Sequence, residues 1–334
     1  MEKKQNILVT GGGGFLGGAI VDMLLKRGDI VSSFSRGTYP ALEKAGVNQI
    51  QGDLSNPEDV HTAVKGMDIV FHVAARPGVW GKFSDYYNTN TVGTKNIVDA
   101  CLAHGVKRLI HTSSPSVVFT AGDMEGADES VPYATTFHTH YVKTKKLAED
   151  YVLGAVKDKG LQAVILRPHL IWGPKDNNLV PRVIQRAKKL VKVGKRDNLV
   201  DTIYIENAAL AHILADEKLS ENPSLSGRVY FITQDDPIPM WDMINGILNA
   251  AGLKPITRSL PHRVVWMIGA VLEGIYTVLR LPGEPKMTRF VADELATAHW
   301  FDISAAKNDL GYQPLISTQE GLKRLADWLK ENPV

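Results

Sequence analysis

The sequence lacks the features that would point to a secreted, membrane-spanning or nucleic-acid-binding protein. It has a single cysteine, Cys101, so no disulfide can form within the chain. Its first residues run into an apolar segment without the pattern of a signal peptide. The uncharged apolar run at 264–272 has only nine residues, whereas about 20 are needed to span a bilayer. The net charge is +2, and no Lys/Arg run stands out. We therefore expect a cytoplasmic protein that binds no nucleic acid.

The composition is that of an ordinary globular protein. Hydrophobic residues make up 44% and charged residues 22% of the 334 positions, which separates the chain from disordered and fibrous proteins and leaves room for two domains. Cys101 lies in an apolar pattern with helical spacing, so we expect it to be buried. No internal repeat, low-complexity tract or clear interdomain linker is present, and the domain boundaries must come from the order of the elements.

The most informative stretch is the first apolar segment, Ile7-Leu8-Val9-Thr10, with the glycine-rich turn after it. Apolar residues then return with helical spacing. This order is typical of the phosphate-binding start of a doubly wound α/β domain. The spacing here is GxxGxxG and not the usual GxGxxG, and the alternative is a flexible glycine turn. The first glycine permits the tight turn, the second lets a pyrophosphate approach, and the third lets helix and strand pack closely. At the helix N-terminus the expected cofactor contacts are Gly11, Gly14, Phe15, Leu16 and Gly17.

The end of the predicted second strand, 30–34, favours NADP(H) over NAD(H). An Asp or Glu there would accept hydrogen bonds from the adenosine ribose of NAD, but the sequence has Ser35-Arg36-Gly37. The Arg36 guanidinium can pair with a 2′-phosphate, and the missing carboxylate removes a repulsive charge. The alternative is that Arg36 is a solvated loop cation.

Two later strand ends add expected cofactor contacts. Asp53, followed by Leu54, can hydrogen-bond the adenine amino group or cap the turn. The strand predicted over 68–75 ends in Ala74 and Ala75, whose small side chains leave room for the ribose and pyrophosphate. His72 falls inside this apolar run, and we expect it to be a hydrogen-bonded core residue.

The alternation of strands and helices predicts the fold class. Further strands are expected at 108–112, 163–167 and 228–233, and a long helix at 88–106. This order predicts an α/β, Rossmann-like, doubly wound parallel sheet. Beyond Pro168 the pattern loosens. We expect residues 1–172, with 200–233 returning, to form the nucleotide-binding domain, and 173–199 and 234–334 to form a smaller, mostly helical substrate lobe with a helix near 180–190.

Hydroxyl and lysine side chains that suit proton transfer follow the strand at 108–112. Ser114 stands in the run Thr112-Ser113-Ser114-Pro115-Ser116, and Tyr141 opens a helix with Lys145 four positions later. That spacing places both side chains on one helix face. A nearby ammonium favours the phenolate, so we expect the pKa of Tyr141 to fall from about 10 toward neutrality. Without a nucleotide turn this would be an ordinary surface pair; with one, it indicates an active site.

These motifs resemble those of the extended short-chain dehydrogenase/reductase superfamily. The resemblance rests on Thr10-Gly-x-x-Gly-Phe-Leu-Gly17, the Ser-rich strand end, Tyr141-x-x-x-Lys145, and Leu166-Arg-Pro-His-Leu-Ile-Trp-Gly-Pro174. Within the superfamily the chain resembles the 3β-hydroxysteroid dehydrogenase-like branch. It is most similar to the bacterial 2-alkyl-3-oxoalkanoate reductases of long-chain olefin biosynthesis, through Trp80-Gly81, 127–133, 179–182, 200–209 and Gly283-Glu284-Pro285.

The resemblance implies a reaction and a role for each residue. NADPH would reduce the 3-keto group of a long-chain 2-alkyl-3-oxoalkanoate to the 3-hydroxy acid. Ser114 matches the catalytic hydroxyl, with Ser116 as the second choice, Tyr141 the proton donor, and Lys145 the lysine that tunes Tyr141 and binds the ribose. Pro168, Leu170 and Ile171 would lie along the nicotinamide, and no metal is implied. Pro115 and Ser116 stand where related sugar dehydratases have Asp-Glu, which argues against dehydration.

The sequence offers several candidates for the substrate contacts and more than one function. A substrate carboxylate needs a cation or donor, and the candidates for substrate contact are Trp80, His138, His169 and Arg182. The first rival is a 3β-hydroxysteroid or decarboxylating sterol dehydrogenase. A regulator that senses NADP without turnover would usually lack the Tyr or the Lys, and a UDP-sugar epimerase fits poorly with an apolar lobe.

The apolar stretch at 264–281 bears on the substrate. It is interrupted by Glu273, and it predicts either a buried helix of the substrate lobe, a lid over a long acyl chain, or a face that docks to a membrane surface or a partner enzyme. A lipid substrate would exploit such a surface, since each buried methylene contributes about 0.8 kcal/mol. A homodimer is also compatible with the sequence.

Overall fold

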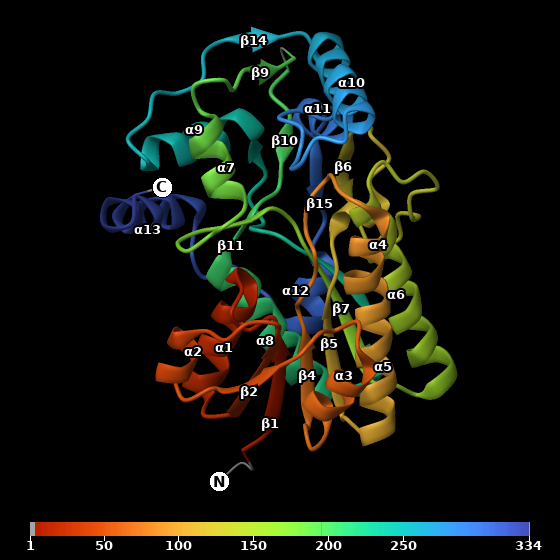
Figure 1. The fold of residues 1–334 in the computed structure, drawn as a ribbon. Coiled ribbons are helices and arrows are strands. Elements are labelled where there is room, and N and C mark those ends of the chain that lie inside the picture. The colour runs from red at the N-terminus through yellow and green to blue at the C-terminus, as the bar shows by residue number, and fades with distance from the viewer. Residues whose placement is uncertain (1–3, 195, 334) are drawn as a thin grey trace.

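A seven-stranded parallel sheet forms the lower half of the molecule in the computed structural model, which describes residues 4–194 and 196–333 (Figure 1). The strand order is β12-β7-β5-β4-β1-β2-β3, and every pairing is parallel. This confirms the predicted Rossmann-like, doubly wound sheet. Its strands are β1 (Asn6–Thr10), β2 (Ile30–Ser35), β3 (Asn48–Gln51), β4 (Ile69–His72), β5 (Arg108–Thr112), β7 (Ala163–Pro168) and β12 (Val229–Ile232).

Helices cover both faces of this sheet because both faces of its strands are apolar. Ile7 and Val9 of β1 pack in one core with α1 and α8, and Leu8 between them packs in the other core with α3, α5 and α6. Alternate side chains of a strand point to opposite faces, so a continuous apolar run needs cover on both sides. Cys101 of α5 is fully buried, as predicted. These helices are α1 (Phe15–Arg27), α3 (Pro57–Val64), α5 (Gly93–His104), α6 (His140–Lys159) and α8 (Ile205–Glu221).

A second lobe lies above the carboxyl ends of these strands (Figure 1). Its four-stranded sheet has the order β13-β10-β15-β6. Its strands and helices are β6 (Met124–Ala127), β10 (Leu199–Val200), β13 (Ile238–Pro239), β15 (His299–Phe301), α7 (Leu179–Arg186), α9 (Met240–Ala250), α10 (His262–Val278), α11 (Arg289–Ala296) and α13 (Thr318–Glu331). Short elements complete the chain: α2 (Pro40–Lys44), α4 (Phe83–Tyr86), η1 (Tyr87–Val92), η2 (Pro115–Val118), β8 (Ile171–Trp172), β9 (Lys192–Val193), β11 (Ile203–Tyr204), η3 (Pro223–Leu225), β14 (Ser259–Leu260) and α12 (Ser304–Leu310).

The chain crosses between the lobes more often than the predicted boundaries allow. β6, from within 1–172, pairs with β15 in the upper sheet. β10 spans the predicted boundary between 173–199 and 200–233 and also lies in the upper sheet. Conversely, α12, from within 234–334, packs against β12 and α8 below. The two- to four-residue strands involved are too short to leave a periodic sequence signal.

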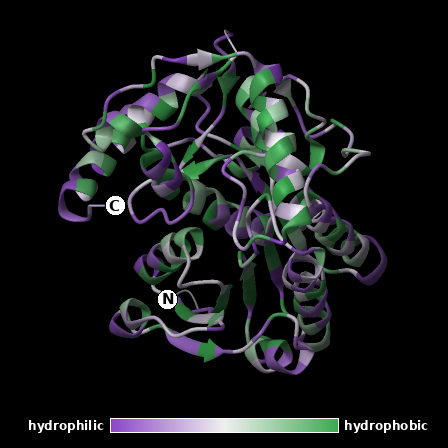
Figure 2. Ribbon diagram, turned by 45° about the horizontal axis from the view of Figure 1, so that its top comes forward, coloured by the Kyte–Doolittle hydropathy of each residue, from purple (hydrophilic) through white to green (hydrophobic). Residues whose placement is uncertain are grey.

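Helix α10 is mostly exposed, although its sequence is apolar. Only Val265 and Gly269 of its residues are buried, so the alternative of a buried helix is wrong. Figure 2 shows α10 as a largely hydrophobic helix on the outside of the upper lobe. Among the described residues, no helix combines the length and the apolar character that crossing a membrane requires.

Candidate active site

A cavity of about 760 Å³ lies where the carboxyl ends of the parallel strands face the upper lobe, the usual position for ligands in such sheets. Most of the predicted site residues line it. These are Gly11, Gly14, Phe15, Leu16, Gly17, Arg36, Asp53, Leu54, Ala74, Ala75, Ser114, Ser116, Tyr141, Lys145, Pro168, His169, Leu170, Ile171 and Arg182. Two predicted substrate contacts, Trp80 and His138, are not among the lining residues. The Trp80 ring instead meets Tyr276 of α10 edge to face, at 6.4 Å between ring centroids.

The glycine turn is shaped to receive a pyrophosphate. Gly11 has a φ of +72°, a conformation that favours glycine. A Cβ on Gly17 would lie 2.1 Å from the carbonyl oxygen of Gly11, so only glycine lets α1 start this close to β1. Gly14 caps α1 without a side chain, and no acidic residue stands in the first turn. The free N–H groups of that turn therefore face the cavity without a competing anion, which fits a dinucleotide.

Thr10 and His72 fix the backbone opposite this turn. The Thr10 hydroxyl oxygen accepts hydrogen bonds from the N–H groups of Val73 and Ala74 at 3.0 and 3.1 Å. It also contacts His72 Nδ1 at 2.9 Å, and His72 Nε2 contacts the Thr94 hydroxyl at 2.9 Å. The prediction of a hydrogen-bonded core histidine is confirmed, and its effect is to hold the 73–75 backbone beside the cavity.

Asn90 is a buried residue of this region that the sequence did not reveal. It lies in the π-helical turn η1, and its side chain bonds both the N–H and the carbonyl of Arg76, at 2.7 and 3.2 Å. It also donates to the Thr144 hydroxyl of α6 at 3.1 Å. Asn90 thus ties the loop that follows Ala75 to the helix that carries Tyr141. The π-turn, a feature frequent at functional sites, leaves no mark on the apolar pattern of 88–106.

The end of the cavity predicted to receive the adenosine carries Arg36 and Asp53. Arg36 follows β2 and is exposed, and across residues 4–194 and 196–333 it forms no ion pair. Asp53 accepts hydrogen bonds from the Ser55 N–H and hydroxyl, both at 2.8 Å, which confirms the capping alternative. The Ser55 N–H lowers the pKa of Asp53, so this carboxylate stays ionised. Arg36 is left as a cation available to a ligand.

Tyr141 and Lys145 lie on the first turns of α6 and both face the cavity. Lys145 is buried, and its Nζ donates to the Thr112 carbonyl oxygen at 2.6 Å. Burial lowers the pKa of Lys145 to about 8, although Glu149 one turn later opposes the shift. The lysine is therefore still largely an ammonium at neutral pH.

The expected lowering of the Tyr141 pKa is wrong for this structure. Burial raises the pKa of Tyr141 above its usual value of 10, and a hydrogen bond with Ser114 opposes only part of that rise. The Lys145 ammonium is directed at the Thr112 carbonyl rather than at the phenol. Tyr141 is thus a neutral O–H donor at neutral pH. Ser114 lies between Tyr141 and Ser116. The hydroxyl oxygens of Ser114 and Ser116 are 2.8 Å apart.

Glu294 of α11 is a second acid in the cavity that the sequence did not reveal. Its carboxyl lines the cavity together with Phe290, Phe119 and Tyr141. Burial raises the pKa of Glu294 to about 8, so the carboxyl is protonated at neutral pH. No motif surrounds Glu294, and it reaches the site only because the C-terminal segment folds back over the sheet.

His169 lines the cavity, but it is neither the cation nor the donor that was predicted for a substrate carboxylate. Burial, followed by the neighbouring His299, holds the pKa of His169 well below 6.5, so the ring is neutral. Its Nδ1 lies 2.7 Å from the Asp201 carbonyl oxygen, which can only accept. The proton is therefore on Nδ1, and Nε2 is left as an acceptor.

Arg182 is the predicted substrate contact that the structure places at the cavity with a cationic side chain. It lies in α7 at the cavity wall, and its guanidinium meets the Glu284 carboxylate at 3.2 and 3.4 Å. The Arg182 side chain is 41% exposed. It is therefore a rim residue whose charge is partly compensated.

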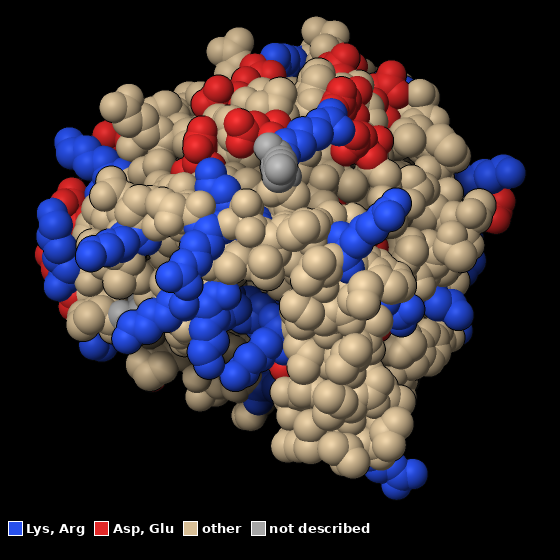
Figure 3. Space-filling view, turned by 90° about the horizontal axis from the view of Figure 1, so that it is seen from above, with Lys and Arg blue, Asp and Glu red and all other residues tan. Residues whose placement is uncertain are grey.

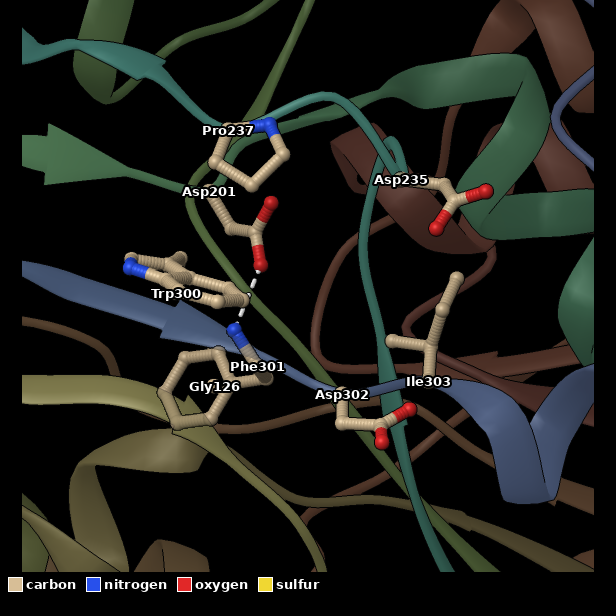
Figure 4. Close-up of a pocket in the computed structure, with 8 residues that line it drawn as sticks. All are labelled: Gly126, Asp201, Asp235, Pro237, Trp300, Phe301, Asp302 and Ile303. Atoms are coloured by element: carbon tan, nitrogen blue, oxygen red, sulfur yellow. Dashed lines mark hydrogen bonds between the residues drawn. The ribbon is translucent and has the colours of Figure 1, made fainter.

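A second, smaller cavity has a volume of about 280 Å³, and Phe301 lines both cavities. Figure 4 shows the Asp201 carboxylate accepting a hydrogen bond from the Phe301 N–H, at 2.8 Å. Burial raises the pKa of Asp201 to about 7. Although Asp235 and Asp302 also line this cavity, no metal-binding cluster of His, Cys, Asp and Glu is found in the part of the chain that the structure describes. Asp201 of this lining also contacts His169 Nδ1 through its backbone carbonyl oxygen.

Comparison with known proteins agrees with this geometry. Residues 8–262 match the 3-beta hydroxysteroid dehydrogenase/isomerase family. The 2-alkyl-3-oxoalkanoate reductase of Shewanella oneidensis is 48% identical over 332 residues, covering 97% of this chain and 86% of the relative. The decarboxylating sterol-4-alpha-carboxylate 3-dehydrogenase of Mus musculus is 34% identical over 330 residues, covering 97% and 91%. The structure of UDP-glucuronic acid 4-epimerase from Bacillus cereus in complex with NAD matches with a TM-score of 0.75 at 24% identity, over 98% of this chain and 99% of that one, which shows a shared fold.

Proposed function

Because the chain belongs to the 3-beta hydroxysteroid dehydrogenase/isomerase family of NAD(P)-dependent oxidoreductases, we propose that it reduces a long-chain 2-alkyl-3-oxoalkanoate to the 3-hydroxy acid with NADPH. The resemblance predicted from its motifs is confirmed at family level. The observation that carries the proposal is the pair of hydroxyls, Ser114 and Tyr141, facing one large cavity beside a dinucleotide turn. The name of the relative at 48% identity supports the substrate class.

Ser114, Tyr141 and Lys145 each have a separate role in the proposed reaction. When bound, the reduced nicotinamide supplies a hydride to the C3 carbonyl carbon. The Ser114 hydroxyl donates a hydrogen bond to the carbonyl oxygen, and the neutral Tyr141 phenol gives that oxygen its proton as negative charge develops on it. Lys145, held by the Thr112 carbonyl, keeps two further N–H donors for the ribose hydroxyls.

The far wall of the cavity suits an alkyl chain. Phe119, Met124, Phe290 and Phe301 line it; the last three come from the upper lobe, and Phe119 follows η2. Each methylene buried there contributes about 0.8 kcal/mol, so affinity should rise with chain length. Loss of NADPH absorbance with 2-alkyl-3-oxoalkanoates of increasing length tests this, and equal kcat/KM for short and long chains would contradict it.

Replacing Arg36 with Ala is expected to weaken NADPH binding roughly 10- to 100-fold, because a charge-assisted hydrogen bond to the 2′-phosphate is lost. NADH binding should hardly change. Calorimetric Kd values for both cofactors check this, with Lys44→Ala, an exposed cation of α2, as the matched control. A parallel loss for NADH would mean that Arg36 acts on the fold and not on the phosphate.

Raising the pH from 7 to 9 is expected to raise the KM for a 3-oxo acid roughly tenfold. Below about pH 8 Glu294 is a neutral carboxyl that can donate to the substrate carboxylate; above it, the two anions repel. Of the other titratable groups in the cavity, His169 and His299 stay neutral across this range, because burial lowers the pKa of each. Lys145 also titrates near pH 8, but it affects acids and ketones alike.

The comparison that isolates Glu294 uses two substrates and one variant. KM is measured between pH 6 and 9.5 for a soluble 3-oxo acid and for a ketone of the same length without the carboxyl group. We expect the rise only for the acid, and we expect Glu294→Gln to remove it. If the variant keeps the same pH dependence, Glu294 does not face the carboxylate.

A sterol dehydrogenase is the second candidate, favoured by the 34% identity to the mouse enzyme. Both enzymes would use the same hydroxyls, so only substrate and cofactor distinguish them. Steady-state rates with a 3β-hydroxysterol and NAD, set against a 3-oxo acid and NADPH, decide between the two.

A further inference from the structure

Helix α10 presents an apolar face to solvent instead of to the protein. Its exposed apolar residues recur at helical spacing, and four of them are more than 60% exposed: Met267 (62%), Val271 (61%), Val278 (79%) and the following Leu279 (63%). We call this the α10 face; it comprises Val264, Met267, Ile268, Val271, Ile275, Val278, Leu279 and Leu281. Such a contiguous exposed apolar surface marks an interaction site.

The opposite side of α10 is held firmly by the protein. Gly269 packs so closely on the segment before α11 that an added Cβ would lie 2.7 Å from the Thr288 carbonyl carbon. The Glu273 carboxylate accepts hydrogen bonds from the Arg289 backbone N–H and Nε, both at 2.7 Å. The helix is therefore fixed with its apolar face outward and is not a loosely folded segment.

The surroundings of the α10 face are basic. Residues 251–289 contain six Lys or Arg and two acidic residues. Both acids are paired, Glu273 with Arg289 and Glu284 with Arg182. In the view from above, a broad area without charged side chains stands beside a dense group of Lys and Arg (Figure 3). Arg263, Arg280 and Lys286 flank the face, and within residues 4–194 and 196–333 none of the three forms an ion pair.

The α10 face also adjoins the substrate cavity. α10 packs against α11, whose Phe290, Val291 and Glu294 line the cavity. Tyr276 of α10 meets Trp80, and the residues just before Trp80, Pro77 to Val79, line the cavity as well. These two segments therefore connect the α10 face with the cavity.

We propose that the α10 face docks in the surface of an anionic lipid bilayer, from which the long-chain substrate enters the cavity. A single apolar helix face rimmed by cations is the pattern of an interfacial helix, and its 17 residues lie along the surface without crossing it. A symmetric contact between two copies would bring the same cations against each other, which disfavours self-association. The entry route rests on the proposed lipid reductase; the docking does not.

Flotation of the full chain with phospholipid vesicles tests the docking. We expect binding to vesicles that contain phosphatidylglycerol, weaker binding to phosphatidylcholine alone, and loss of binding at high salt. The double variant Met267→Glu, Val271→Glu should bind roughly tenfold or more weakly. Leu315→Glu is the matched control, because Leu315 is 74% exposed but lies far from α10 in sequence.

Turnover of a short, water-soluble 3-oxo acid serves as the folding control and should be unchanged in both variants. Failure of the wild-type chain to float with anionic vesicles overturns the docking. A dimer in solution that the double variant converts to monomer also overturns it, since the face then binds a second copy. If the chain floats but reduces no 3-oxo acid, the docking stands and the proposed function fails.

Discussion

Tyr141→Phe is expected to lower kcat for ketone reduction by about 10²- to 10⁴-fold and to leave NADPH binding nearly unchanged. The Tyr141 ring is partly buried against the core, so phenylalanine should occupy the same position. Only the O–H that gives its proton to the substrate oxygen, and that bonds Ser114, is lost. Single-turnover rates together with the Kd for NADPH provide the measurement.

The control for this variant comes from the same cavity. Tyr39 lines the adenosine end, and Tyr39→Phe should keep kcat within a few-fold, because no proton is transferred there. Ser114→Ala should fall between the two, since it removes a hydrogen bond to the carbonyl but leaves the acid. A Tyr141→Phe protein with wild-type kcat would remove Tyr141 from the reaction and the proposed mechanism with it.

The sequence predicted the nucleotide half well because its signals are local. β1, the glycine turn and α1 follow one another within 30 residues, and the strand at Arg108–Thr112 was predicted to the residue. The strands of a parallel sheet are buried on both faces, so each appears as an unbroken apolar run that periodicity identifies directly. The motif Tyr141-x-x-x-Lys145 then placed the acid on one face of α6, facing the cavity.

What could not be predicted depends on contacts between distant segments. Spacing shows that Lys145 shares a face with Tyr141, but not that its ammonium bonds the Thr112 carbonyl, and so the direction of the Tyr141 pKa was missed. Glu294 and His299 reach the cavity from the last sixth of the chain. An apolar helix such as α10 looks the same in sequence whether its face is buried or exposed, because hydrophobicity alone does not tell what covers it.

Glu149→Leu is expected to lower the free energy of unfolding by about 3–5 kcal/mol, the largest stability effect we predict. Glu149 of α6 holds Arg167 of β7 through two hydrogen bonds, Nε to Oε1 at 2.8 Å and an amino nitrogen to Oε2 at 2.9 Å. The side chains are 0% and 3% exposed. The single substitution leaves the buried Arg167 guanidinium, which lies over the rings of Tyr133 and Phe231, without the carboxylate that pairs with it.

Urea unfolding of three variants shows how much of the loss in unfolding free energy comes from breaking the Glu149–Arg167 pair. Glu149→Leu with Arg167→Met should recover most of the loss, because removing both charges also removes the unpaired one. Asp150→Ala, which breaks the exposed pair with Lys146 on the same helix, should cost no more than about 0.5 kcal/mol. Since Glu149 also opposes the lowering of the Lys145 pKa, its loss should shift the alkaline limb of kcat below pH 8 in any variant that still folds. Equal destabilisation by Glu149→Leu and Asp150→Ala would mean that the buried pair contributes no more to stability than the exposed one.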